Sequence, residues 1–340
     1  MTDDERVFLR GISSDQYGAA EFRRMQRSSP RVVKGGWKLD ASKAGYGDHG
    51  KGSIATWLVG PGDEPFHTQT LQAHFVELIP GGWNAGHGHQ NEAFFYILEG
   101  KGYDIHDGVR YDWEKDDVVI VHNDSAHKHW NASQTDRALA LVMKAKATWM
   151  FLGLMQQGKG GPAENGFGPR EDWSRLWSPE AKGQKKIIRP SDTRWETTRE
   201  GRVRVITSAA RTDLRAHSVD LYQQEIAPRS RSPRHWHMAD ELVYVMAGRG
   251  HSLHWDVEAE IDDRYYARIA TAPSRWDVAA GEILYMPPNT VHQHYSDGDE
   301  PLVLLSAQNR MFKTLGYDST AYLEEAPEAG RPKEVARTGA

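Results

Sequence analysis

Two histidines spaced two residues apart, with a glutamate four residues further on, constrain the fold of this chain more than any other feature. They are His235, His237 and Glu241, in the segment that runs from Arg234 to Gly248. Side chains on a β-strand alternate between its two faces, so all three point the same way in an extended segment. Two imidazoles and a carboxylate on one face are ligands that hold a divalent first-row metal ion.

A second segment offers a fourth ligand. An alternating stretch that starts at Gly281 is followed by a Pro-Pro-Asn turn and then by His292. Together the two segments resemble the two motifs of the cupin superfamily, whose members are small β-barrels of the jelly-roll type. Two residues depart from the usual motifs. Asn289 replaces the turn glycine, and asparagine tolerates the left-handed conformation. Ser296 stands where the second motif usually ends in asparagine.

The pattern occurs twice in the chain. His87-Gly-His89 matches His235-Trp-His237, and the run from Asp124 to His129 matches the run from Asn289 to His294. The resemblance is therefore to a bicupin, an all-β protein with two tandem jelly-roll barrels and short helices in an N-terminal arm and a linker. We expect an arm over 1–66, barrel 1 over 67–155, a linker over 156–195, barrel 2 over 196–318 and a flexible tail over 319–340.

Three segments outside the repeated motifs carry weaker signals. A helix is expected over 15–27 and an irregular stretch over 34–51; arms of this kind either pack across a neighbouring subunit, as in a homo-oligomer, or stay on the surface. Trp173 and Trp177 indicate a short helix in the linker. The insert over 256–277 is charged and aromatic, which is typical of a surface loop or lid.

The two predicted sites differ in one ligand. His87, His89 and His127 hold the places of His235, His237 and His292, but Ala93 holds the place of Glu241. Glu92 comes one residue too early, and on a strand such an offset turns a side chain to the opposite face. The candidate metal ligands are thus three histidines in barrel 1 and three histidines with a carboxylate in barrel 2.

In its three-histidine site the chain resembles the gentisate, salicylate and 1-hydroxy-2-naphthoate 1,2-dioxygenases, which are bicupins. That resemblance implies Fe(II) and a hydroxylated aromatic acid that is cleaved by dioxygen in the N-terminal barrel. His129 matches a histidine of the substrate pocket in that family, and His294 is its counterpart in barrel 2; either assists proton transfer or orients a ligand. Gln224 matches a substrate-contacting glutamine, but from the other barrel.

The complete ligand set in barrel 2 departs from that family and leaves alternatives open. Bicupins that resemble oxalate decarboxylase keep two full sites, generally with Mn(II), so a decarboxylase or isomerase of a small acid or sugar is the second hypothesis. A non-catalytic metal-binding bicupin is the third. The sequence does not decide which barrel carries the chemistry.

Composition excludes several other classes. The chain has 340 residues, no cysteine and a formal net charge of −5 with both signs interspersed. Neither a thiolate site nor an electrostatic affinity for nucleic acid is indicated. The charged N-terminus and the absence of a long apolar run predict a cytoplasmic protein without membrane spans.

Overall fold

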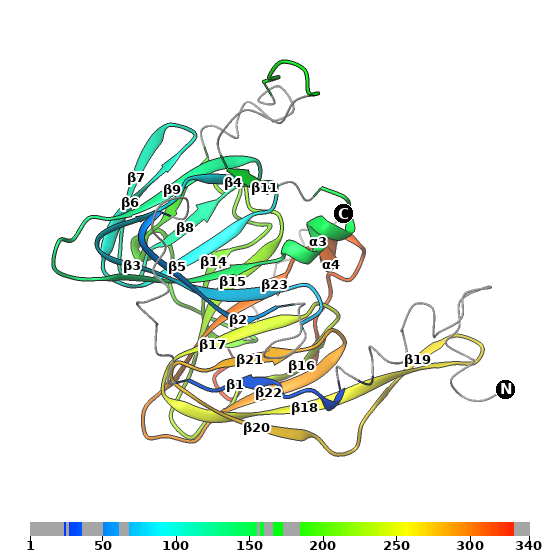
Figure 1. Cartoon of the computed structure of the whole chain (residues 1–340). Helices are drawn as coiled ribbons and strands as arrows, with labels where there is room; N and C mark the ends of the chain where they lie inside the picture. The colour runs from blue at the N-terminus through cyan, green and yellow to red at the C-terminus, as the bar shows by residue number, and fades with distance from the viewer. Residues whose placement is uncertain are drawn as a thin grey trace, which may run out of the picture.

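Two β-barrels make up the described part of the chain, with barrel 1 in the upper half of Figure 1 and barrel 2 in the lower half. The computed structural model describes residues 24, 27–35, 50–60, 68–154, 157–159, 166–172 and 184–329. The all-β prediction and the prediction of two tandem barrels are confirmed.

Barrel 1 is one continuous sheet of eleven strands. Its strands are β2 Gly50–Val59, β3 Gln72–Asn84, β4 His87–His89, β5 Ala93–Glu99, β6 Lys101–His106, β7 Val109–Glu114, β8 Val118–Val121, β9 Ser125–Asn131, β10 Ala138–Lys144, β11 Gln157–Lys159 and β12 Ile187–Ile188. The long strand β3 pairs with β9 as well as with β2 and β10, so the sheet closes around its interior.

Barrel 2 is built from a seven-stranded and a six-stranded sheet. Its strands are β1 Val32–Val33, β13 Glu196–Thr198, β14 Gly201–Thr207, β15 Val219–Ile226, β16 Arg234–His237, β17 Glu241–Ala247, β18 Arg249–Ile261, β19 Tyr265–Ile269, β20 Ser274–Ala279, β21 Ile283–Met286, β22 Thr290–Ser296, β23 Leu302–Asn309 and β24 Ala321–Glu324.

The described helices are short and repeat with the barrels. Helix α3 (Lys146–Phe151) follows β10, and helix α4 (Met311–Thr314) follows β23; a 3-10 turn, η6, covers Pro190–Asp192. The helix predicted at Trp173 and Trp177 lies outside the described residues, as does nearly all of the helix predicted over 15–27. In the part of the chain that is described, no helix has the length and apolarity needed to cross a bilayer.

Strand alternation separates the three largest apolar clusters of the core. On β10 one face points into barrel 1, where Ala138, Ala140 and Val142 pack in a buried apolar cluster. The other face carries Leu141 and Met143 into a second cluster that also contains residues of barrel 2. A third cluster fills the interior of barrel 2. Each barrel therefore has its own core, and a shared core holds the two together.

Several strands lie beyond the predicted barrel boundaries. β2 belongs to barrel 1 although the arm was expected to reach residue 66, and β1 joins barrel 2 by pairing with β21. β11 and β12, from the predicted linker, both pair within barrel 1. The prediction of a flexible tail from residue 319 is wrong for β24, which pairs with β16. Each of these pairings satisfies the backbone groups of a strand that would otherwise have a free edge.

The insert of barrel 2 is an exposed β-hairpin rather than a loop. β18 runs out to Ile261 and β19 returns from Tyr265 to Ile269, with every residue of β19 exposed. Figure 1 shows this hairpin extending away from the barrel on the right. The predicted surface position is confirmed, but the segment has regular structure.

Candidate metal centres

Site 1 lies between β4 and β9 of barrel 1. Antiparallel pairing sets His87 directly opposite His127, and His89 follows on the same face of β4. The ring centroids are 4.4 Å apart for His87 and His127 and 4.8 Å apart for His89 and His127. One nitrogen of each ring lies within 4.8 Å of the others. Among the described residues no carboxylate belongs to this group.

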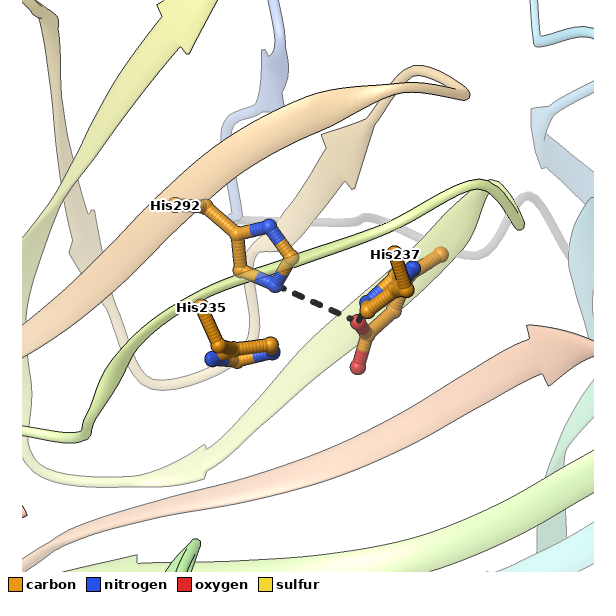
Figure 2. A group of neighbouring side chains, drawn as sticks. His235, His237 and His292 are labelled. Carbon is orange, nitrogen blue, oxygen red and sulfur yellow. Dashed lines mark hydrogen bonds and ion pairs between the residues drawn. The ribbon is translucent and has the colours of Figure 1, made fainter. Parts of the chain in front are cut away.

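Site 2 has the same register in barrel 2 and adds the carboxylate. His235 lies opposite His292 on β16 and β22, with ring centroids 4.2 Å apart. Figure 2 shows the three imidazoles turned toward one another. Glu241, at the start of β17, reaches the same point: its Oε2 lies 3.1 Å from Nε2 of His237 and 3.6 Å from Nε2 of His292.

The protonation of the six imidazoles is set by the main chain. In each ring Nδ1 lies within hydrogen-bond distance of a carbonyl oxygen two residues away, from 2.7 Å for His89 to 3.3 Å for His87 and His235. A carbonyl only accepts, so Nδ1 carries the proton and Nε2 presents its lone pair to the centre of the cluster.

A cation would satisfy these lone pairs. Nε2 of His127 and of His292 are buried without a hydrogen-bond partner. In site 2 the Nε2 lone pair of His237 also faces a carboxylate oxygen of Glu241, so two acceptors meet. A metal ion between them would satisfy both, and the donor sets fit one: neutral nitrogens in site 1, and nitrogens with one anionic oxygen in site 2.

Burial favours the neutral form of four of these histidines. It lowers the pKa of His87, His127 and His235, and burial followed by the positive charge of Lys144 lowers the pKa of His89 to about 3. Burial alone would raise the pKa of Glu241, but the imidazoles of His237 and His292 beside it outweigh burial and hold that pKa well below its usual range. Neutral imidazole and ionised carboxylate are the forms that bind metals.

The residue before each fourth-ligand position joins the two barrels. Glu92 points away from the histidines, as predicted, and its carboxylate accepts hydrogen bonds from the backbone N–H groups of His217 and Ser218. Asp240 does the same in the other direction, accepting from the N–H groups of Thr70 and Leu71. Both carboxylates are fully buried, so the two halves are tied by an equivalent pair of contacts.

A family model described as "Cupin domain" matches residues 74–144 and 222–307, which cover both sites. The chain is a bicupin. Comparison of its sequence with curated proteins finds no match.

Solved bicupin structures share the fold at low identity. Salicylate 1,2-dioxygenase from Pseudaminobacter salicylatoxidans has a TM-score of 0.58 and 12% identity, covering 79% of this chain and 80% of that chain. Oxalate decarboxylase from Bacillus subtilis has a TM-score of 0.53 and 15% identity, with 86% and 79% covered. Vicilin from Corylus avellana has a TM-score of 0.54 and 10% identity, with 87% and 88% covered. The likeness extends to two enzymes of different reaction types and to vicilin.

Behind site 1 of the bicupin, a carboxylate links two further histidines. Asp104 is completely buried and accepts hydrogen bonds at Oδ2 from Nδ1 of His129 at 2.7 Å and from Nε2 of His106 at 3.1 Å. Its Oδ1 accepts from Trp113 Nε1 at 2.7 Å. Burial alone would raise the pKa of Asp104, but His129 and His106 outweigh it and lower that pKa to about 2. His129 therefore keeps its proton on Nδ1, and its buried Nε2 is a free acceptor.

The corresponding place in barrel 2 is held by a serine. Ser252 Oγ lies 2.9 Å from both His254 Nε2 and His294 Nδ1. Arg31, from the segment before β1, donates to His254 Nδ1, so the proton of His254 sits on Nε2 and is donated to Ser252. The Ser252 hydroxyl can donate its own proton to two acceptors. His294 Nδ1 is the nearer, at 2.9 Å, and the Gln293 carbonyl oxygen lies at 3.4 Å. This favours the proton of His294 on Nε2, the reverse of His129.

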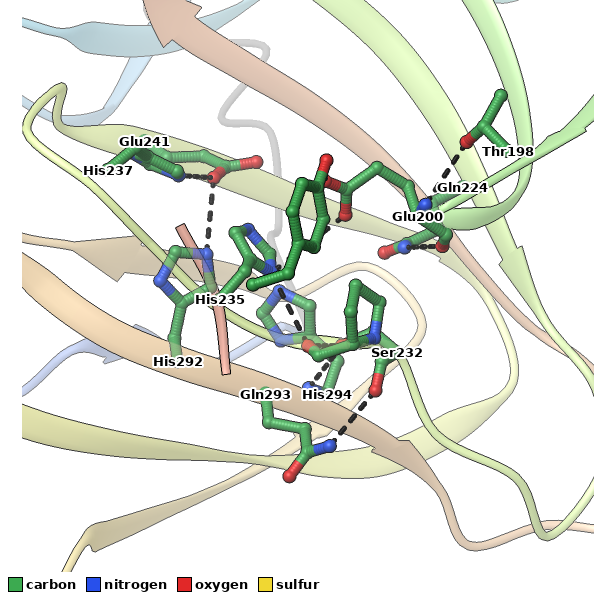
Figure 3. Close-up of polar contacts among 12 residues, drawn as sticks. Thr198, Glu200, Gln224, Ser232, His235, His237, Glu241, His292, Gln293 and His294 are labelled. Carbon is green, nitrogen blue, oxygen red and sulfur yellow. Dashed lines mark hydrogen bonds and ion pairs between the residues drawn. The ribbon is translucent and has the colours of Figure 1, made fainter. Parts of the chain in front are cut away.

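Other predicted residues lie near the sites or away from them. Gln224 donates its amide to the main-chain oxygen of Glu200 at 2.6 Å, to one side of the histidines of site 2 in Figure 3. Phe94, beside site 1, faces the shared core, and Phe95 packs on His129. Trp236, between the two histidines of β16, faces outward and donates its Nε1–H to Asn289 Oδ1.

Four polar residues near the sites were missed by sequence reasoning. In site 2 the hydroxyl of Tyr222 donates to Glu241 Oε1 at 2.7 Å, and Glu200 Oε2 lies 3.8 Å from Nδ1 of His235. In barrel 1 they are Asp104 and Lys144. Tyr222 could have been predicted from the repeat, which aligns it with His74. Strand alternation places both residues on the inner face of their strands.

Proposed function

We propose that this bicupin is an Fe(II)-dependent dioxygenase that cleaves the ring of a hydroxylated aromatic acid at site 1. The observation that carries the proposal is the ligand set: three neutral imidazoles, with Ala93 where barrel 2 has Glu241. Such a set leaves the double charge of the ion uncompensated, which favours a substrate that brings negative oxygens of its own. Bound iron would supply the activation of dioxygen and of the substrate together.

The residues of barrel 1 have defined tasks in this proposal. His87, His89 and His127 would hold the ion through Nε2. His129 would accept the proton of the substrate hydroxyl at its free Nε2, because Asp104 fixes the proton of the ring on Nδ1. Apolar side chains of the barrel interior exclude water from the reacting atoms.

We expect the substrate of this proposal to lie toward the mouth of barrel 1, because the interior is small. The cavity lined by His129, Asp104 and apolar residues such as Phe95 and Ile97 has a volume of about 20 Å³. That is room for about one water molecule, which occupies roughly 10–15 Å³ by this measure. An aromatic acid would therefore lie on the outer side of His129 rather than beneath it.

The complete ligand set of site 2 supports a second candidate. A Mn(II) decarboxylase or isomerase acting on a small acid or sugar would use His235, His237, Glu241 and His292. The structural neighbour oxalate decarboxylase from Bacillus subtilis has Mn(II) centres and is compatible with this candidate. The dioxygenase has support from the salicylate 1,2-dioxygenase neighbour and from a variant of that enzyme in complex with gentisate, with a TM-score of 0.60.

Metal analysis and oxygen uptake test the proposal. Protein purified without added metal is analysed for iron and manganese, then loaded anaerobically with Fe(II) and given a panel of hydroxybenzoates. We expect one dioxygen consumed for each ring opened. If no hydroxylated aromatic acid consumes oxygen while oxalate or another small acid is turned over with Mn(II), the second candidate replaces the first.

A further inference from the structure

The carboxylate of Glu241 in barrel 2 is held by its own set of donors. Tyr222 donates its hydroxyl to Oε1 at 2.7 Å, and Gln308 donates its amide to Oε2 at 3.2 Å. The carboxylate thus lies where the histidines and two neutral donors converge, at the end of the barrel 2 interior. Site 1 has the same backbone at this place without the carboxylate.

Strand register identifies what barrel 1 has instead of those donors. On β3 and β10, His74 pairs with Val142, and the next inward position pairs Gln72 with Lys144. On β15 and β23, Tyr222 pairs with Ser306, and the next inward position pairs Asp220 with Gln308. His74 and Lys144 therefore hold the places of Tyr222 and Gln308, while Ala93 holds that of Glu241.

Lys144 is a cation on the inner face of β10, and no described residue is its acidic partner. It continues the inward-facing series Ala138, Ala140 and Val142 on β10 and is partly exposed at the mouth of the barrel. Within the described part of the chain no carboxylate pairs with its ammonium group, which lies 5.4 Å from the centre of the Trp57 ring. Lys146, at the start of α3, adds a second positive charge that lowers the pKa of Lys144. A cation in such a place is costly unless an anion is bound beside it.

His74 adds an unsatisfied polar atom at the same place. Its side chain is 7% exposed, and its Nδ1 is buried without a hydrogen-bond partner. Burial, followed by the charges of Lys144 and Lys146, lowers its pKa, so the ring is neutral and can donate from one nitrogen. The ring of His74 packs against Trp57, with ring centroids 4.6 Å apart.

We propose that site 1 binds the carboxylate of its substrate in the place that the carboxylate of Glu241 occupies in barrel 2, with Lys144 and His74 as its donors. The inference rests on the proposed function, because it specifies how the acid substrate of that site is held. It also specifies the substrate class: the group recognised is a carboxylate, and a phenol without one lacks the anchor. The two barrels differ at three paired positions: Glu241 and Ala93, Tyr222 and His74, and Gln308 and Lys144. With these changes, the place of a protein carboxylate in barrel 2 becomes a binding place for a substrate carboxylate in barrel 1.

Calorimetric titration with benzoate tests the inference without turnover. The full-length protein, loaded with Zn(II), is compared with Lys144→Gln, which installs the residue of barrel 2, and with Lys128→Gln as matched control. Lys128 lies on the outward face of β9, with its ammonium group 3.9 Å from the centre of the Trp83 ring. We expect Lys144→Gln to weaken benzoate binding about 10- to 100-fold, as for loss of a charge-assisted hydrogen bond, and Lys128→Gln to leave it unchanged.

A second variant tests the place itself. Ala93→Glu would put a carboxylate where barrel 2 has one, so we expect it to abolish benzoate binding and to tighten metal binding. Benzamide, which is neutral, should bind the wild-type protein far more weakly than benzoate. The inference is overturned if wild-type protein does not bind benzoate, if benzamide binds as well, or if Lys144→Gln binds benzoate like the control.

Oxygen uptake by the same variants separates this inference from the proposed function. Benzoate binding that depends on Lys144, together with no oxygen uptake on any hydroxylated acid, would remove the proposed function and keep the carboxylate site. Oxygen uptake with benzoate binding that is indifferent to Lys144 would do the opposite. Near-ultraviolet circular dichroism confirms that each variant is folded.

Discussion

Barrel 1 and barrel 2 each place one buried carboxylate close to their histidines, but at different positions. In barrel 2 it is Glu241, among the candidate ligands; in barrel 1 it is Asp104, which bonds His129 and His106 behind them. Ala93 and Ser252 hold the two exchanged places. The anionic group therefore lies among the candidate metal ligands in barrel 2, and beside His129 in barrel 1.

The groups around each site change in the same direction. Site 2 has a second carboxylate nearby, Glu200, which accepts a hydrogen bond from Tyr322 of β24. Site 1 instead has Lys144 and Lys146 nearby, whose positive charges lower the pKa of His89 and of His74. An acidic surrounding retains a cation, whereas a basic one attracts an anionic ligand to it. In the proposed function, site 2 would therefore retain a metal ion, and site 1 would bind the anionic substrate.

The largest effect is expected from removing one candidate ligand in each barrel. His127→Ala should reduce oxygen-dependent turnover to background, because site 1 loses its ion. Glu241→Ala should leave turnover largely intact and lower the metal content of site 2. Oxygen uptake and metal analysis of both variants check this. Activity lost with Glu241 and kept without His127 would move the chemistry to barrel 2.

A smaller effect is expected at the carboxylate behind site 1. Asp104→Asn should lower kcat by about 10- to 100-fold with the metal retained, because the amide no longer forces the proton of His129 onto Nδ1. Ser252→Ala in barrel 2 is the matched change and should alter turnover little. Equal losses in both variants, or loss of iron from Asp104→Asn, would mean that Asp104 only supports the fold.

Much of this comparison was predictable from the alternation of strand residues. The facing of His87 and His89, the turning away of Glu92 and the left-handed conformation of Asn289, with φ of 61°, all follow from local rules and are observed. These features depend on neighbours in sequence or on one strand pair.

What the sequence did not predict depends on tertiary pairing. β24 and β11 lie beside β16 and β4 only because each barrel leaves an edge there, and their sequences carry little strand signal. Lys144 and Gln308 become counterparts only through register, since the insert of barrel 2 breaks the constant spacing of the repeat. Gln224 was named from its match to a substrate-contacting glutamine of the resembled family, and its amide donates to the main-chain oxygen of Glu200.

A pH dependence should distinguish the sites. Burial, followed by the charge of Lys146, lowers the pKa of Lys144 to about 8. The lysine is protonated below that value, so carboxylate binding at site 1 should be full below pH 8 and fall as the pH rises through 8. The fall should be up to about tenfold for each pH unit, since one proton is needed for each anion bound. His74, His87 and His89 face the same space and are neutral throughout this range.

Titration of benzoate between pH 6.5 and 9.5, chosen to span about 1.5 units on either side of that pKa, checks the prediction. Lys144→Gln is the control and should show weak binding that does not change over the range. A decline of the same size in that variant would assign the titrating group elsewhere.

The smallest effect is expected where the two barrels are equivalent, at the contacts between them. Glu92 accepts two main-chain N–H bonds and the Ser218 hydroxyl, all buried in the interface. Glu92→Gln would turn an amide donor toward those N–H groups and should lower the free energy of unfolding by about 1–3 kcal/mol, measured by denaturant titration. Metal content should not change, because the side chain faces away from the histidines. Asp240→Asn, the counterpart in barrel 2, should have a loss of similar size.

Because the shared core joins both barrels, each variant should still unfold in a single transition. Two separate transitions would show that the barrels are held together mainly by these carboxylates rather than by the apolar cluster between them.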